Sequence, residues 1–187
     1  MTTPITKRKF TVDEFHRMLQ AGILREDDRV ELIQGEIVEM TPVGSRHAAC
    51  VKRLNRLLSR GVGDAAIVSI QDPVRLGPDS EPQPDIALLR PRPDFYADRH
   101  PAAGDVLLIV EVADASAAYD RDTKLSLYAR AGIPEVWLVD LTANQLEVYR
   151  RPSPQGYGEK EVYRPGMRVS PEALPALSLP VAEILGT

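Results

Sequence analysis

The sequence predicts one mixed α/β or α+β domain, on three observations. Helical and strand patterns alternate along the chain in the order helix, two strands, helix, three strands, helix, strand and further strands. The run Val106–Ala113 is apolar at nearly every position, which is typical of a central strand covered on both faces. The 187 residues, 43% apolar and 27% charged, suit a single domain of ordinary size. We therefore predict one domain over residues 1–187, with its core at about 45–140.

The first 40 residues predict a helix followed by a β-hairpin. Thr11 is a good N-cap, and Glu14 three residues later completes a capping box. Gly22 ends the helix. The alternating run Arg29–Met40 is divided by Gln34-Gly35, which indicates two strands and a tight turn. Glu31 alternates with Leu32 in the first strand, which is compatible with a side chain that faces solvent.

The rest of the chain supplies the predicted central sheet and its helices. Ser45 is predicted to cap a helix that continues to about Arg60 and ends at Gly61 and Gly63. The remaining elements, in order, are strands Ala65–Ile70 and Val74–Leu76, a turn at 78–84, strand Asp85–Leu89, a loop at 91–104, strand Val106–Ala113, helix Asp120–Ala131, strand Val136–Val139, an antiparallel tail at 146–149 and 161–163, and a short helical end at 175–185.

Composition excludes several classes of protein. The single cysteine, Cys50, excludes a disulfide framework and any cysteine-clustered zinc or iron–sulfur site. The apolar runs are too short for a membrane helix, and the N-terminus lacks the apolar core of a secretory signal, so a cytoplasmic location is expected. A net charge of -4 argues against coating nucleic acid by bulk electrostatics, but a local basic face would suffice for an enzyme.

Two acidic residues stand in or beside apolar strands. Glu111 lies inside Val106–Ala113, where an unpaired carboxylate would be costly. It either reaches solvent or an arginine at the strand end, or it binds a cation. Asp85 follows Pro84, either in an ordinary turn or as a partner of Glu111 if the two strands pair antiparallel. Two converging carboxylates would attract Mg²⁺ or Mn²⁺, which prefer oxygen ligands. We predict that these carboxylates share one cation.

Lys124 is the only lysine between Lys52 and Lys160 in a chain that prefers arginine. It lies four residues after Asp120 and four before Tyr128, so the three share one face of the predicted helix. This pattern is compatible with a surface Asp–Lys pair. It is also compatible with a helix that packs on the sheet and brings Lys124 to the two acids, where it would act on a water or a phosphate.

The order of these residues resembles the PD-(D/E)XK nuclease superfamily, which places an Asp on one core strand and an acid-x-Lys tripeptide on the next. Position 113 is Ala rather than Lys. The wider pattern looks like the Uma-type family of restriction endonucleases, in which the lysine has moved to the following helix, and Lys124 matches it. The motifs that carry this resemblance are Glu31-Leu-Ile-x-Gly-Glu36, Pro42, Ser45-Arg-His47, Pro84-Asp85-Ile, Glu111-Val, Asp120-x₃-Lys124-x₃-Tyr128 and Gly132–Asp140.

The resemblance implies a restriction-endonuclease-like fold, a mixed central sheet flanked by helices, with an N-terminal helix and hairpin and a C-terminal β extension. It also implies a Mg²⁺- or Mn²⁺-dependent endonuclease that acts on DNA, with Asp85 and Glu111 as metal ligands and Lys124 as a catalytic residue. Two further positions match the family. Glu36 is either a catalytic acid or an exposed turn residue, and His47 either contacts phosphate or carries a proton, or bonds backbone at a helix start.

The predicted 45–60 helix carries arginines that would hold the DNA backbone if it faces DNA, namely Arg46, Arg53, Arg56 and Arg60. Duplex cleavage requires two sites or two nicks, so a homodimer is plausible. Two other readings stay open at this level. The domain is either a non-catalytic nucleic-acid-binding or assembly module on a nuclease fold, or a binder of a small phosphorylated ligand, although no Gly-rich phosphate loop supports the latter. His16 and His100 carry no chemical signal.

Overall fold

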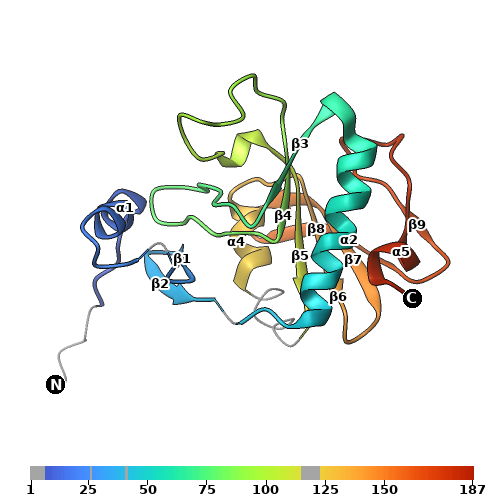
Figure 1. Cartoon of the computed structure of the whole chain (residues 1–187), viewed down its shortest axis with the longest axis horizontal. Coiled ribbons are helices and arrows are strands. Elements are labelled where there is room, and N and C mark those ends of the chain that lie inside the picture. Colours follow the sequence, from blue (N-terminus) through green and yellow to red (C-terminus); the bar gives the residue numbers. More distant parts are fainter. Residues whose placement is uncertain (1–6, 26, 41, 115–122) are drawn as a thin grey trace.

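The computed structural model describes residues 7–25, 27–40, 42–114 and 123–187. These residues form a mixed α+β structure around one six-stranded sheet (Figure 1). The strand order is β3-β4-β5-β6-β7-β8, in which β5 and β6 are parallel and every other neighbouring pair is antiparallel. The strands are β3 Ile67–Ile70, β4 Ile86–Leu89, β5 Val106–Ala113, β6 Glu135–Asp140, β7 Gln145–Ser153 and β8 Gly156–Tyr163. The predicted fold class, including the C-terminal β extension of β7 and β8, is confirmed.

Strand β5 is the centre of the fold, as its sequence predicted. Seven of its eight residues are buried, and its side chains alternate between two apolar cores. Leu108, Val110 and Val112 face one core, whereas Ile109 and Ala113 face the other. Glu111 has the odd-numbered parity of the second group, and this alternation points it toward the second core.

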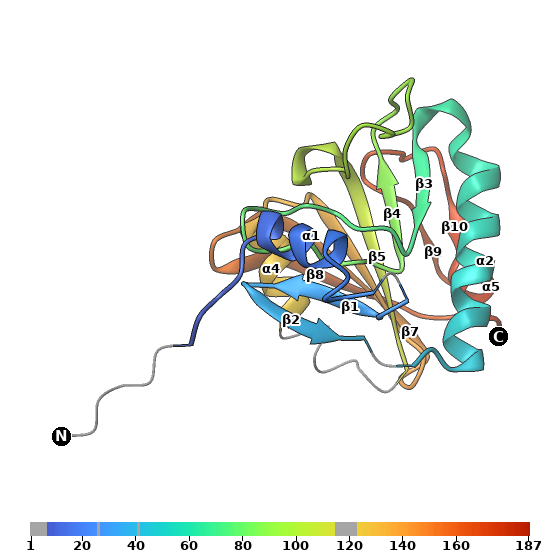
Figure 2. The same ribbon diagram turned by 60° about the vertical axis from the view of Figure 1, so that its left-hand side comes forward.

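The two faces of the sheet are covered by different elements (Figure 2). One face packs against α2 (Ser45–Val62) and α5 (Val181–Leu185), with the short pair β9 (Arg168–Val169) and β10 (Leu179–Pro180) beside them. The other face packs against α4 (Leu125–Arg130), whose Leu125 and Tyr128 lie in the second core. The N-terminal unit, made of α1 (Val12–Gln20), β1 (Val30–Ile33) and β2 (Glu36–Glu39), lies on this second side.

The N-terminal unit has its own small core of Val12, Phe15, Val30 and Leu32. The predicted capping box of Thr11 and Glu14 is present. Gln34 and Gly35 both have positive φ, 51° and 78°, as the tightest hairpin turns require. A Cβ at residue 35 would come within 2.6 Å of the Lys9 side chain, so this position needs glycine.

Three local expectations were wrong. Gly44, not Ser45, is the N-cap of α2, and α2 passes through Gly61 to end at Val62, with Gly63 as its C-cap as predicted. Residue 61 is glycine because the Leu177 side chain packs where a Cβ would lie. Residues 74–76 form no regular strand, since the Val74, Arg75 and Leu76 amides donate to carbonyls in separate loop segments.

The predicted strand at 65–70 begins later, because the short 3-10 helix η1 (Gly63–Ala65) precedes it. A second 3-10 helix, η2 (Ala103–Asp105), ends the predicted 91–104 loop. The first part of the predicted 120–131 helix, with Asp120, lies outside the described residues. None of the helices within the described ranges combines the length and apolar character needed to cross a membrane.

Candidate active site

Asp85 lies immediately before β4, beside Glu111 of β5. The antiparallel register pairs Ile86 with Val110, so the residues on either side of this pair, Asp85 and Glu111, are at the same level of the sheet. Asp85 is 9% exposed, and its Oδ2 accepts a hydrogen bond of 2.9 Å from the Val112 backbone amide. The sheet therefore fixes one carboxylate against the strand that carries the other.

Two side chains outside the sheet also hold Asp85. His47, in the first turn of α2, has its Nε2 2.9 Å from Asp85 Oδ2. Gln71 donates its side-chain amide to Oδ1 at 3.2 Å and its backbone amide to the Asp85 carbonyl, also at 3.2 Å. Gln71 has a φ of 54°, a left-handed conformation that non-glycine residues seldom adopt. Strained backbone of this kind is frequent at functional sites, and here it aims both Gln71 amides at one residue.

Glu111, on the opposite strand, meets α4 through two donors. The Lys124 Nζ lies 3.3 Å from Glu111 Oε1, and the Tyr128 hydroxyl donates to the same oxygen. Tyr128 follows Lys124 by four residues, so one side of this segment presents both groups to the strand. Lys124 is 6% exposed and Glu111 5%, which makes this a buried ion pair rather than a surface pair.

A third carboxylate reaches the same lysine from the N-terminal unit. Glu31 Oε2 lies 3.3 Å from Lys124 Nζ and accepts a hydrogen bond of 3.1 Å from the Gln83 backbone amide. The solvent-facing reading of Glu31 is therefore wrong, because the hairpin packs on the sheet and all four β1 residues are buried. Glu31 and Gln71 are the two site residues that sequence reasoning missed. For Glu31 the motif Glu31-Leu-Ile-x-Gly-Glu36 was the available signal.

The structure does not bring Glu36 to this cluster. Glu36 is exposed at the start of β2, opposite Ile33. Ile33 is two residues beyond Glu31, which is a separation of roughly 7 Å along a strand. Among the described residues, no hydrogen bond or ion pair links Glu36 to Asp85, Glu111 or Lys124. Its exposed position agrees with the alternative that Glu36 is an exposed residue of the hairpin turn, so it has no role in the proposed mechanism.

Cys50 lies close to this site but is not a nucleophile. Its thiol is buried in the core under α2 and donates to the Ile184 carbonyl. Burial raises the pKa of the Cys50 thiol to about 11. The Arg53 charge opposes this shift, and the Asp85 charge adds to it. The thiol is therefore protonated at neutral pH and contributes packing.

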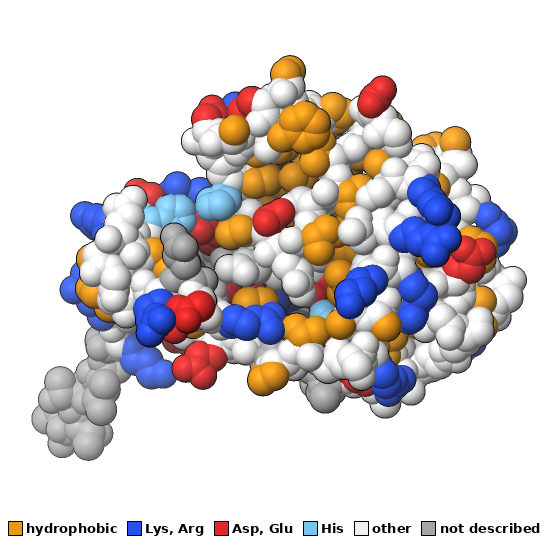
Figure 3. Space-filling view, viewed as in Figure 1, with side chains coloured by type: hydrophobic (Ala, Val, Ile, Leu, Met, Phe, Trp, Pro, Cys, Tyr) orange, Lys and Arg blue, Asp and Glu red, His pale blue; other side chains and the backbone are white. Residues whose placement is uncertain are grey.

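The site has the donor set and charge of a divalent-cation site. Asp85, Glu111 and Glu31 supply three buried carboxylates, whereas Lys124 supplies one ammonium and His47 an imidazole. Carboxylate oxygens are the ligands preferred by Mg²⁺ and Mn²⁺, and a bound cation would relieve the repulsion among the acids. The surface is hollowed between the N-terminal unit and α2, with acidic atoms visible inside the hollow (Figure 3).

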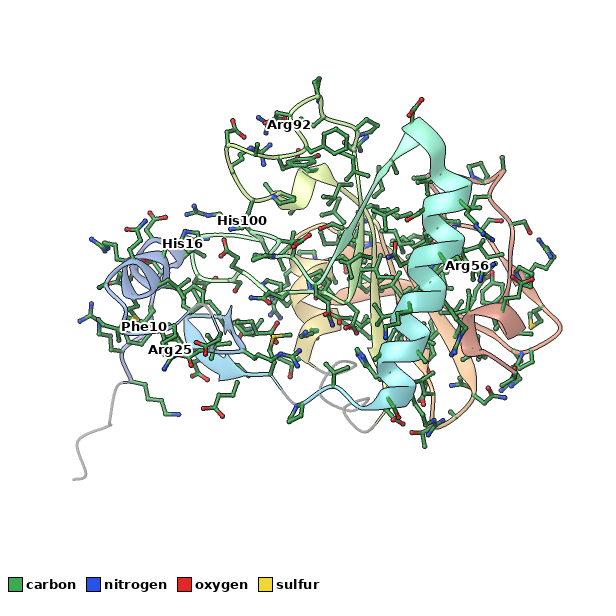
Figure 4. All side chains as sticks on the ribbon, viewed as in Figure 1. Phe10, His16, Arg25, Arg56, Arg92 and His100 are labelled. Carbon is green, nitrogen blue, oxygen red and sulfur yellow. The ribbon has the colours of Figure 1, made fainter. Side chains whose placement is uncertain are left out.

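The arginines of α2 divide into two pairs. Arg46 contacts Asp114 and the Leu141 carbonyl, and Arg53 donates to the carbonyls of Ile184 and Leu185 at the end of α5. Arg53 therefore fastens α5 to α2, and the expectation that it holds DNA is not supported. Arg56 and Arg60 are exposed, and Arg56 projects from the outer side of α2 (Figure 4).

Three comparisons show which known proteins this chain resembles. The model of a family named Uma2, described as "Putative restriction endonuclease", matches residues 12–182. The chain is 28% identical over 129 residues to the "Uncharacterized protein sll1609" of Synechocystis sp., across 66% of this chain and 73% of that protein. A crystal structure from Anabaena variabilis, described as "a putative nuclease belonging to DUF820", superposes with a TM-score of 0.73 at 21% identity, covering 95% of this chain and 98% of that one. At 21% identity this last likeness shows the fold alone.

Proposed function

We propose that this chain, which belongs to the Uma2 family, is a divalent-metal-dependent endonuclease. In this proposal it hydrolyses phosphodiester bonds of DNA. One observation carries the proposal. A buried lysine, Lys124, lies 3.3 Å from both Glu111 and Glu31, next to the start of β4, where Asp85 stands beside Glu111 of β5. A buried lysine surrounded by acids is costly as a purely structural device, which favours a chemical role.

The residues have separable roles in the proposed reaction. Asp85 and Glu111 would hold the metal ion through carboxylate oxygens, and the ion would lower the pKa of bound water and neutralise the scissile phosphate. Val112, Gln71 and His47 fix the orientation of Asp85, so that its carboxylate needs little rearrangement on binding. Mg²⁺ and Mn²⁺ both suit these ligands.

Lys124 would position the attacking water or stabilise the charge that develops on the phosphate. Its ammonium is held at a fixed point by contacts to Glu111 on the sheet and Glu31 on the hairpin. His47, at the N-terminal end of α2 and in contact with Asp85, is placed to orient the carboxylate or to carry a proton. Arg56 and Arg60 would contact the DNA backbone from the exposed side of α2.

Two broader features belong to the same proposal. One active site cleaves one strand, so cutting a duplex needs two sequential nicks or a homodimer that presents two sites. The activity would take place in the cytoplasm, where the DNA substrate is present.

Nicking of supercoiled plasmid tests this function. We expect the wild type to nick the plasmid with Mg²⁺ or Mn²⁺ and to stop when a chelator is added. Asp85→Asn keeps the size of the side chain but removes its charge, so it should be inactive and folded. Asp94→Asn, on an exposed residue of the 91–104 loop, is the matched control and should cleave normally.

Cleavage that continues in chelator, or equal cleavage by Asp85→Asn, would contradict the proposal. The alternative, a non-catalytic nucleic-acid-binding module, makes a different prediction. Such a module would shift the mobility of DNA in a gel with both the wild type and Asp85→Asn, and neither protein would cut it.

A further inference from the structure

A second group of metal-ligating side chains lies away from the candidate active site. His16 on α1, Glu81 in the loop between β3 and β4, and His100 in the loop between β4 and β5 each offer one ligand atom, and these atoms all lie within 4.8 Å of one another. The two imidazoles approach each other from separate segments (Figure 4), with ring centroids 5.9 Å apart and ring planes at 71°.

Glu81 is the unusual member of this group. It is 3% exposed, and its Oε1 lies 2.6 Å from His16 Nε2. Its second oxygen, Oε2, is also buried and has no hydrogen-bond partner within the described structure. Buried carboxylate oxygens normally accept hydrogen bonds or bind metal, because removing them from water is otherwise unfavourable. A buried carboxylate oxygen without a donor, beside two imidazoles, is a suitable ligand for a cation.

We propose that His16, Glu81 and His100 form a second metal site, which takes Zn²⁺ or a similar first-row transition ion. Two imidazole nitrogens and one carboxylate oxygen are typical zinc ligands, whereas Mg²⁺ prefers oxygen alone. Three protein ligands would leave a fourth tetrahedral position for water. Two ligands of a tetrahedral Zn²⁺ stand roughly 3.3 Å apart, which lies between the 2.6 Å His16–Glu81 contact and the 4.8 Å upper limit of the group, so binding needs shifts of no more than about 1.5 Å.

The charges around the group permit a cation. Arg75 and Arg99 line the same cavity, which has a volume of about 590 Å³. Each guanidinium is already paired with an acid, Arg75 with Asp13 at 2.9 Å and Arg99 with Asp105 at 2.7 Å. The positive charges are thus offset by carboxylates of their own, and the buried Glu81 charge remains for the metal.

The site would act as a brace. Its ligands come from the N-terminal unit and from two loops that are distant in sequence. The Glu81 amide donates to the Leu32 carbonyl at 2.7 Å, and Leu32 is the neighbour of Glu31, the hairpin residue that contacts Lys124. A metal at this site would therefore fasten α1 and the loop between β4 and β5 to β1, the strand that carries Glu31 of the candidate active site.

Calorimetric titration of the metal-free full-length protein with Zn²⁺, in excess Mg²⁺, tests the proposal without measuring cleavage. We expect one Zn²⁺ per chain for the wild type. His100→Ala, a change of an exposed side chain, and the nearly isosteric Glu81→Gln should each weaken binding at least tenfold. Asp85→Asn is the matched control, because it alters the nuclease site alone and should bind Zn²⁺ as the wild type does.

A second readout identifies the ligands directly. The chain has three histidines, so Zn²⁺ should shift the imidazole NMR signals of His16 and His100 and leave those of His47 in place. Unchanged affinity in His100→Ala, loss of binding in Asp85→Asn, or a shift of the His47 signals alone would overturn the site. None of these results depends on whether the protein cleaves DNA, so the two proposals fail separately.

Discussion

Two buried glutamates on neighbouring strands, Glu111 of β5 and Glu135 of β6, show how differently one sheet treats a carboxylate. Glu135 has no exposed surface, and its Oε1 accepts hydrogen bonds from Arg150 at 2.8 Å and from the Trp137 indole at 2.8 Å. Its Oε2 accepts the Glu172 backbone amide at 2.6 Å. One guanidinium therefore balances the one buried carboxylate, and neutral donors complete the shell of Glu135; the second acid that Arg150 contacts, Glu161, is half-exposed.

Glu111 lies in a cluster where acidic groups outnumber the basic group that they contact. It shares Lys124 with Glu31, while Asp85 stands beside it on the adjacent strand. The acids outnumber the lysine, so under the proposed function this cluster would gain from a further cation, whereas the buried Glu135–Arg150 pair is balanced without one. The comparison is between a buried ion pair that stabilises the fold and a cluster that is proposed to bind a metal ion.

The largest expected effect is on catalysis at the acidic cluster. Lys124→Ala should lower the initial rate of Mn²⁺-dependent plasmid nicking at least about 100-fold, the usual cost of losing one group that stabilises the transition state. Lys124→Arg should also fail, because a planar guanidinium cannot replace a compact ammonium at a fixed point. Lys160→Ala, which removes an ion pair with Glu147, should keep the wild-type rate. An active Lys124→Ala protein would remove the distinction between the two clusters.

The next effect is on stability at the balanced pair. Glu135→Gln leaves Arg150 without its buried counter-charge, and breaking such a pair costs about 3–5 kcal/mol. For a domain of this size the melting temperature should fall by roughly 10 °C. Thermal and urea unfolding measure the loss, and the nicking rate per folded molecule should not change. A drop in that rate with unchanged stability would reverse the roles of the two glutamates.

Mn²⁺ should raise the melting temperature through the acidic cluster and not through the Glu135–Arg150 pair. At a hundredfold excess over its dissociation constant, an ion that binds only the folded state adds about 2.7 kcal/mol, or roughly 5–10 °C in melting temperature. Melts with chelator or with Mn²⁺ should show this shift in the wild type and in Glu135→Gln, and little of it in Asp85→Asn. The His100→Ala background excludes a contribution from the His16–Glu81–His100 group. Equal shifts in that background with and without Asp85→Asn would place the ion elsewhere.

The sequence predicted those parts of the molecule that follow from local pattern. The apolar run of β5 identified the central strand, and its single acid, Glu111, stood out because a carboxylate is rare there. Asp85 and Lys124 were predicted as site residues from their position relative to that strand and from the family resemblance, and the structure places both beside Glu111. The hairpin turn and the α1 capping box depend on a few adjacent residues and were also predicted.

The missed features depend on how distant segments pack. Alternation along the hairpin does not reveal that β1 is buried against the sheet, so Glu31 looked exposed. The left-handed φ of Gln71 has no sequence signature, and the His16–Glu81–His100 group joins residues up to 84 positions apart through two loops. Gly61 was predicted to end a helix because the residue that requires a glycine there, Leu177, lies more than 100 positions away in the sequence.

The smallest expected effect tests whether burial explains the contrast. Arg150 also contacts Glu161, at 3.4 Å, but the Glu161 side chain is 47% exposed, whereas that of Glu135 is fully buried. An exposed ion pair is worth about 0–1 kcal/mol, because water and salt screen it. Glu161→Gln should therefore lower the melting temperature by roughly 0–4 °C, less at high salt, against the much larger loss for Glu135→Gln. The same guanidinium serves both acids, so equal losses would mean that burial does not decide what a carboxylate contributes.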